Sequence, residues 1–151
     1  MFEILMFLFE SYFDAGNYPD SDKLSIKLSA AGFDDGDIHQ ALIWLSGLKQ
    51  LSQSDYPEII NSTNLRCFAD LELRRISAEG LQFISFWEHS KMITPIEREM
   101  IIDRALAFER DNLPLNDVKL IALMVLWNKH EDLDPLIVED LLTPASSGLL
   151  H

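Results

Sequence analysis

The chain has a single cysteine, Cys67, among its 151 residues. One cysteine cannot form an intramolecular disulfide, and it cannot supply a cysteine-rich zinc site. We therefore expect a protein of the reducing cytoplasm whose stability comes from packing. The hydrophobic content of 48% is enough for a substantial core, so disorder of the whole chain is not expected.

Basic residues are also scarce, with 12 Lys and Arg against 25 Asp and Glu and a formal net charge of −13 at pH 7. A surface with this excess of negative charge repels nucleic acid and anionic lipid unless a local cationic patch overrides it. The composition therefore disfavours nucleic acid as a partner. It favours another protein with a basic or mixed surface.

Long apolar runs are missing. The run from Leu120 to Trp127 is far shorter than the roughly 20 residues that a bilayer-spanning helix needs, so it predicts a buried helix. The apolar first ten residues lack a basic segment and a small-residue cleavage site, and Glu3 and Glu10 bracket them, which is unlike a signal peptide. We expect no membrane association and a cytoplasmic location.

Sequence motifs for catalysis and metal binding are absent as well. The histidines, at positions 39, 89, 130 and 151, do not pair at metal-ligand spacing. Ser85 and His89 lie one helical turn apart, as a nucleophile and its base would, but no residue to orient the base and no glycine-rich oxyanion loop accompany them. We predict a non-enzymatic protein with no catalytic residue, cofactor or metal. A hydrolase built on Ser85 and His89 remains as an alternative.

Apolar residues recur at helical spacing along most of the chain. In the first half they predict an N-terminal helix, a second helix capped by Ser21, and a third capped by Asp34. Gly32 suits the end of the second helix, and Phe33 and Ile38 suit a hydrophobic staple around Asp34. Two helices joined by a tight turn behind an N-terminal helix predict a helix-turn-helix-like unit.

The second half also predicts helices, after a polar loop over 52–64. Residues 65–68 favour a very short strand followed by a helical turn, as in a wing, although 70–76 suits two turns of helix equally. Local signals then mark the expected helix boundaries. The starts are Ser77, Thr94 with Glu97 as a capping box, Asn116 with a Leu115–Leu120 staple, and Asp134 with Pro135; the ends are Trp87, about Arg110 and, for the last helix, Pro144.

These elements predict a mainly α protein. Its N-terminal helix-turn-helix unit covers 1–76, open to a winged-helix form with at most a minimal β-hairpin. This unit packs on a C-terminal helical unit over 77–142, and a flexible tail follows over 143–151.

Apolar residues outside the inner stripes of their helices are candidates for binding another protein. Phe7 lies on the acidic face of the first helix, and Ile43 lies beside His39 and Gln40 on the outer face of the third. We therefore predict a protein-interaction or regulatory adaptor that uses these four residues. The alternative is that the C-terminal helices cover them.

A DNA-binding regulator of the winged-helix type is the alternative function. Its candidate phosphate contacts are arginines that flank or follow the expected wing. Acidic residues among them, and aspartates at the start of the third helix, oppose this function because they would face phosphate with like charge. The arginines are Arg66, Arg74 and Arg75.

Several segments spread along the chain resemble the Smg family of small bacterial proteins. The resemblance covers essentially the whole chain, and it implies a cytoplasmic bacterial protein with a helical, winged-helix-like N-terminal half. The family has no settled function, so it supplies no catalytic residue. The segments are Met1–Phe2 with Leu5–Glu10, Ala31–Asp34 with Ile38, Ala41–Leu42 and Trp44–Leu45, Glu97–Glu99 with Ile102–Arg104, Lys119 with Leu123–Trp127, and Gly148–His151.

Overall fold

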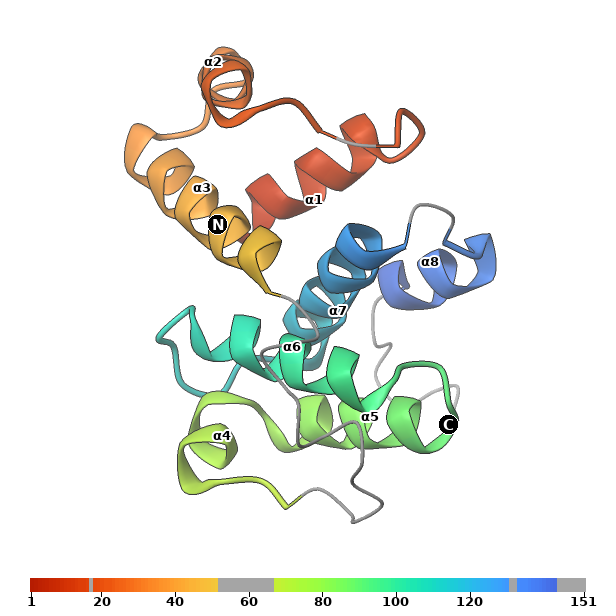
Figure 1. The fold of residues 1–151 in the computed structure, drawn as a ribbon. Helices are drawn as coiled ribbons and strands as arrows, with labels where there is room; N and C mark the ends of the chain where they lie inside the picture. Colours follow the sequence, from red (N-terminus) through yellow and green to blue (C-terminus); the bar gives the residue numbers. More distant parts are fainter. Residues whose placement is uncertain (17, 52–66, 131–132, 144–151) are drawn as a thin grey trace. The chain divides into compact units, whose positions relative to one another are not determined.

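The computed structural model describes residues 1–16, 18–51, 67–130 and 133–143, which contain α-helices and no strand (Figure 1). The mainly α class predicted from the sequence is confirmed. The chain divides into two compact units, Met1–Gln50 and Leu51–His151. The helices are α1 (Phe2–Tyr12), α2 (Ser21–Ala30), α3 (Asp35–Gln50), α4 (Asp70–Arg75), α5 (Ala78–His89), α6 (Pro95–Leu106), α7 (Leu115–Lys129) and α8 (Pro135–Leu142).

The first unit consists of α1, α2 and α3, and α3 packs against both of the others. Each helix turns an apolar stripe inward because its apolar residues recur every three or four positions. Removing these stripes from water is the main force that holds the unit together. The buried residues are Ile4, Leu5, Leu8 and Phe9 of α1, Leu24 and Leu28 of α2, and Ile38, Ala41, Trp44, Leu45 and Leu48 of α3.

The turn between α2 and α3 forms as its residues predict. Gly32 has a φ of +97°, in the left-handed region that glycine adopts without a Cβ clash. The carboxylate of Asp34 then accepts a hydrogen bond from the amide of Gly36 at 3.0 Å and so caps α3. A glycine stop and an aspartate start within three residues produce the tight connection.

The second unit is organised around α7, which packs against α5, α6 and α8. Every residue from Leu120 to Trp127 is buried, so this stretch of α7 has no polar face and depends on the surrounding helices. The predicted buried helix is confirmed. Gly80 lets α5 approach closely, because a Cβ at this position would lie 2.8 Å from Cγ2 of Val118 in α7.

Three predicted helix starts in the second unit carry the capping hydrogen bonds that were expected. The hydroxyl of Ser77 accepts the amide three residues ahead at 3.1 Å. Thr94 accepts the amide of Glu97 at 3.1 Å, and the Glu97 carboxylate accepts the amide of Thr94 at 2.9 Å, which completes the capping box. The carboxylate of Asp134 accepts the amide two residues ahead at 2.9 Å.

Three other predicted boundaries are wrong. The N-cap of α2 is Asp20, one residue before the expected serine. The N-cap of α7 is Pro114, whose extended backbone places Asn116 inside the first turn. Helix α6 ends at Leu106, before Arg110, because the following residues leave the helical path and residue 109 has a φ of +53°.

The segment that the sequence left open between a wing and a helix contains helix α4. The buried Glu72 accepts a hydrogen bond from the amide of Ala69 at 2.9 Å, which stabilises the first turn. Residues 67 and 68 form no strand, and 65 and 66 lie outside the described residues. In the described ranges, β pairing is limited to one isolated bridge, between Ile76 and Leu113, so no wing hairpin is present there.

Helix α4 belongs to the second unit, so the division after Gln50 differs from the boundary expected at Ile76. It packs against α6, and the carbonyls of Arg74 and Arg75 accept hydrogen bonds from the loop that precedes α7. The expected tail lies outside the described residues, except for Thr143. No helix in the described ranges is long and apolar enough to cross a membrane.

Candidate functional site

His39, Gln40 and Ile43 lie on one face of α3, because steps of three or four residues return to the same side of a helix. All three are exposed, and Ile43 keeps 59% of its surface accessible. Ser46 and Gln50 are also exposed and continue this face. We call these five residues the outer face of α3; none of them is Asp, Glu, Lys or Arg, although the chain carries a net charge of −13.

Aspartates surround the N-terminal end of α3. Asp34, Asp35 and Asp37 are all exposed there. Their carboxylates compensate the positive end of the helix dipole, which would otherwise attract an anion. A phosphate group that approached this end would therefore meet negative charge.

Phe7 does not stand free on α1. Its side chain is half-buried, and its ring packs edge-to-face against Phe33, with centroids 5.5 Å apart and planes at 73°. Because Phe33 belongs to the turn before α3, this contact attaches α1 to the turn. Phe7 thus contributes to the packing of the first unit.

The arginines proposed for phosphate contacts have a carboxylate beside them. Arg74 Nε lies 3.6 Å and Arg75 Nε 3.4 Å from the same oxygen of Asp111. Arg66 lies outside the described residues. The structure brings two of the three predicted residues together, but it does so around an aspartate, which reduces the positive charge that they offer to phosphate.

Among the described residues, those considered for hydrolysis or metal binding are not assembled into a site. Ser85 and His89 are both exposed and share no hydrogen bond. Among the described residues, no group of three or more His, Cys, Asp or Glu side chains is placed to hold a metal ion. His151 lies outside these residues.

An ion cluster around the buried Arg98, at the start of α6, was not predicted. Arg98 is 5% exposed, and its guanidinium lies 2.7 Å from Glu88 and 2.7 Å from Glu99. The capping residue Glu97 also contacts Nε2 of His130 at 2.6 Å, which links the start of α6 to the end of α7. The sequence shows the capping box, because Thr94 and Glu97 are only three positions apart. It does not show the contact between Glu97 and His130, which are 33 positions apart.

This Glu97–His130 pair resembles a base with its orienting carboxylate. Catalysis would also require a nucleophile within reach of the imidazole. In the described part of the chain, no serine, threonine or cysteine side chain hydrogen-bonds to His130. What the arrangement shows is a contact that joins the start of α6 to the end of α7.

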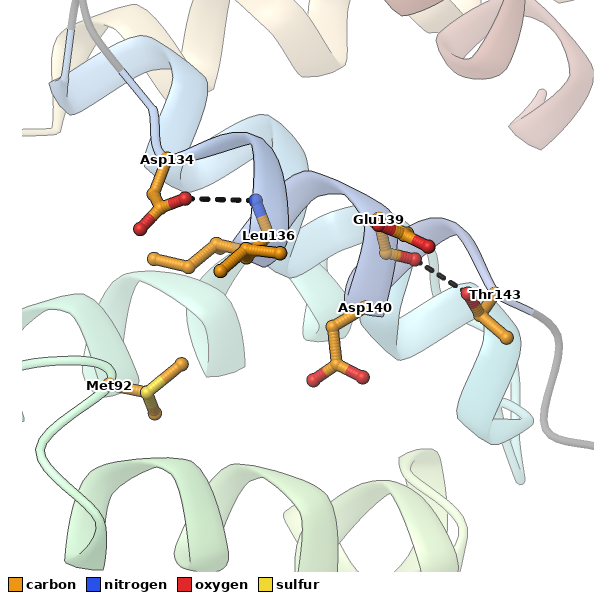
Figure 2. A pocket seen from close by; sticks show the side chains of 7 residues that line it. Met92, Asp134, Leu136, Glu139, Asp140 and Thr143 are labelled. Carbon is orange, nitrogen blue, oxygen red and sulfur yellow. Dashed lines mark hydrogen bonds between the residues drawn. The ribbon is translucent and has the colours of Figure 1, made fainter. Parts of the chain in front are cut away.

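A pocket of about 550 Å³ lies beside α8. Figure 2 shows Met92 on one side of it, across from the residues that α8 contributes. We call it the α8 pocket; sequence reasoning missed it because Met92 and α8 are distant in the chain. Its lining residues are Met92, Asp134, Leu136, Ile137, Glu139, Asp140 and Thr143.

Burial changes the acidity of two side chains away from these surfaces. It raises the pKa of Tyr18 from 10.0 to about 12, because the phenolate would lose hydration. It also raises the pKa of Asp117, an effect that the positive charge of Arg110 partly opposes. Neither group lies in the outer face of α3 or in the α8 pocket.

Comparison with known proteins places the whole chain in one family. A family model described as "Protein of unknown function (DUF494)" matches residues 1–151. The "Protein Smg homolog" of Methylobacillus flagellatus is 38% identical over 151 residues, with 100% of both chains covered. The chain belongs to the Smg family.

Other Smg relatives agree with this assignment. The homologues of Azoarcus sp. strain BH72 and of Nitrosomonas europaea are each 41% identical, over 155 and 152 residues, and again all of both chains is covered. These descriptions name no reaction and no ligand. No solved structure matches the chain.

Proposed function

We propose that this protein is a non-enzymatic adaptor of the bacterial cytoplasm that binds another protein through the outer face of α3. The observation that carries this proposal is Ile43, an apolar side chain left 59% exposed in the middle of an uncharged helical face. Fully burying a side chain of this size contributes about 1.5–3 kcal/mol. His39 and Gln40 beside it supply the polar groups of an interface rim.

Charge indicates the kind of partner. The chain has a net charge of −13, and Asp35 and Asp37 are exposed in the first turn of α3. Carboxylates beside an apolar contact attract a basic or mixed surface and repel an acidic one. A single cysteine, Cys67, suits a reducing compartment such as the cytoplasm.

Photo-crosslinking in native cells tests this proposal. A photoreactive amino acid at position 40 should form one adduct of defined mass, because the probe lies next to the apolar contact. The matched control is the same probe at Glu10, which is exposed on α1. Introducing Ile43→Asp into the position-40 variant should remove the adduct. Equal adducts at positions 40 and 10, or an adduct that survives Ile43→Asp, would contradict the proposal.

DNA binding is the second candidate, and the tight turn between α2 and α3 is the feature that favours it. Asp111 beside Arg74 and Arg75 is an argument against it. Fluorescence anisotropy with a labelled duplex at about 20 and 200 mM salt separates the two, since binding through phosphates weakens steeply with salt. The adaptor proposal expects no binding at either concentration. Low-salt binding that Arg75→Glu abolishes would favour a DNA-binding regulator instead.

A further inference from the structure

We propose that the α8 pocket is a second binding surface and that it takes a basic amphipathic segment of another protein, with apolar side chains flanked by lysine or arginine. This surface lies within the second unit and is separate from the outer face of α3. The inference goes beyond the adaptor function above, because it names another site and the chemistry of its ligand.

The pocket combines apolar side chains that remain accessible to water. Leu136 is 72% exposed and Met92 is 41% exposed, and the two lie on opposite sides of the hollow in Figure 2. Methionine adapts its shape to different apolar partners because its side chain is unbranched and polarizable. An apolar side chain that enters between Leu136 and Met92 would remove both from water.

Carboxylates surround this apolar floor. Asp140 and Glu139 follow Leu136 by four and three residues, so they lie on the same side of α8. In Figure 2 the Asp140 side chain extends into the space between α8 and Met92. Asp134, which caps α8, lies at the other end of the pocket. None of these three carboxylates forms an ion pair within the described part of the chain.

The helix itself makes two of these carboxylates, Glu139 and Asp140, unfavourably placed. The C-terminal end of a helix carries partial negative charge, which cations stabilise and anions destabilise. Helix α8 has no basic residue in its last turn, whereas Glu139 and Asp140 lie there. Lys119 reaches this end through the carbonyl of Thr143, at 3.5 Å, and its ammonium also lies 5.9 Å from the ring centroid of Phe83. A cation supplied by a ligand would therefore add to the stability of α8.

Charge complementarity decides between the possible occupants. Nucleic acid and anionic lipid would face three carboxylates, and a second copy of this chain would bring another net charge of −13. A basic helix or extended segment matches both features, because its apolar residues reach the floor while its lysines or arginines meet the rim. This is the helix-in-groove mode of recognition, with acidic residues in place of a neutral rim.

Binding of a designed peptide to the full chain tests the inference. The probe is a labelled peptide of about 14 residues in which leucine recurs every three or four positions and lysine fills the rest. A second peptide has the same composition in scrambled order, and anisotropy measures both affinities. The site variant is Leu136→Ser with Asp140→Asn. The matched control is Ile26→Ser with Asp22→Asn on α2, where Ile26 is 71% exposed and Asp22 is exposed.

We expect the site variant to weaken binding of the amphipathic peptide about tenfold and the control variant to change it less than about twofold. The scrambled peptide should bind the wild type as weakly as the amphipathic peptide binds the site variant. Equal affinities for the two peptides, or equal effects of the two variants, would overturn the inference, because binding would then depend on net charge alone. All four substituted side chains are exposed, and thermal melts verify that the variants remain folded.

Two further measurements test a different binding site for the peptide and a different occupant for the pocket. Ile43→Asp should leave the peptide affinity unchanged; if it abolishes binding while the site variant does not, the peptide binds the outer face of α3 and the inference fails. Sedimentation velocity of the wild type and of Leu136→Ser tests a second copy as occupant. A wild-type dimer that this substitution converts to a monomer would make the pocket a copy-to-copy interface and overturn the proposal. Failure of the probe at position 40 to form its adduct would contradict the adaptor function proposed above. It would not affect the peptide result, which tests the α8 pocket alone.

Discussion

At the scale of single residues, Tyr18 shows how packing changes the chemistry of a side chain. Its phenol titrates near pH 10 when hydrated, and burial raises its pKa to about 12. The ammonium of Lys49 lies 4.7 Å from the ring centroid, where it interacts with the face of the ring. The folded protein therefore holds this proton to a higher pH than the unfolded chain does.

The sign of the resulting pH dependence follows from this difference. Below pH 10 both states are protonated; between pH 10 and about 12 the unfolded state loses the proton first, so stability falls as pH rises. In the wild type, Tyr18 should cause a loss of about 2–3 kcal/mol in the free energy of unfolding across this range. Tyr18→Phe should not show this loss, because phenylalanine does not titrate. Urea unfolding of both proteins from pH 8 to 12 measures it. If the two proteins lose stability in parallel, Tyr18 is not the group responsible.

The residue scale also shows what periodicity can and cannot predict. It placed Ile43 outside the inner stripe of α3, and the side chain is exposed. It placed Phe7 outside the stripe of α1 as well, but the ring of Phe7 packs against Phe33 of the turn before α3. Helical spacing assigns a face to a residue, whereas the element that covers that face is known only when the turn is known.

At the scale of elements, local hydrogen bonds explain the boundaries that the sequence predicted. The start of α6 is the clearest, because Thr94 and Glu97 satisfy each other's backbone amides within one turn. The predicted start of α7, by contrast, was wrong. Pro114 begins this helix through its backbone geometry and makes no side-chain cap hydrogen bond. The sequence did not decide between a helix and a wing strand at α4. Contacts with α6 and with the loop before α7 stabilise this helix, and local sequence does not show such contacts.

Removing the cap of α6 should destabilise the second unit. Thr94→Ala loses the hydrogen bond from the Glu97 amide and should cost about 1 kcal/mol in the free energy of unfolding. Thr94→Ser keeps the accepting oxygen and should retain most of the stability. Ser85→Ala, at an exposed position inside α5, is the matched control and should have almost no effect. Chemical denaturation compares them, and equal stabilities for Thr94→Ala and Thr94→Ser would show that the cap bond does not contribute.

At the scale of the whole molecule, net charge is the dominant electrostatic feature. Carboxylates outnumber basic groups 25 to 12, so they repel one another in the folded state more than in the expanded unfolded chain. Raising NaCl from about 20 to 300 mM shortens the range of this repulsion. We expect the free energy of unfolding to rise on the order of 1 kcal/mol, the scale at which exposed charges act.

A charge-reduced variant provides the control for this salt effect. Asp35→Asn with Asp37→Asn removes two exposed carboxylates from the start of α3. Its stability should respond less to salt than that of the wild type, because less repulsion remains to be screened. A constant or falling stability with salt in the wild type would mean that attractive charge pairs, such as those of Arg98, outweigh the repulsion.

The long-range organisation of the molecule was the hardest part to predict. The sequence indicated helices and two units, but it did not predict that the chain divides after Gln50. It also gave no sign that Glu97 meets His130 or that Met92 lies across a pocket from α8. Each of these features depends on which helices become neighbours around α7, and a periodic pattern carries no information about neighbours.

The burial of α7 on all sides has a consequence for synthesis. A helix without a polar face adheres to other apolar surfaces while it is unprotected, and nascent chains grow from the N-terminus. Helices α5 and α6 precede α7 in the chain and α8 follows it, so two of its three packing partners leave the ribosome before it does. The order of the helices shortens the time during which this apolar segment meets water alone.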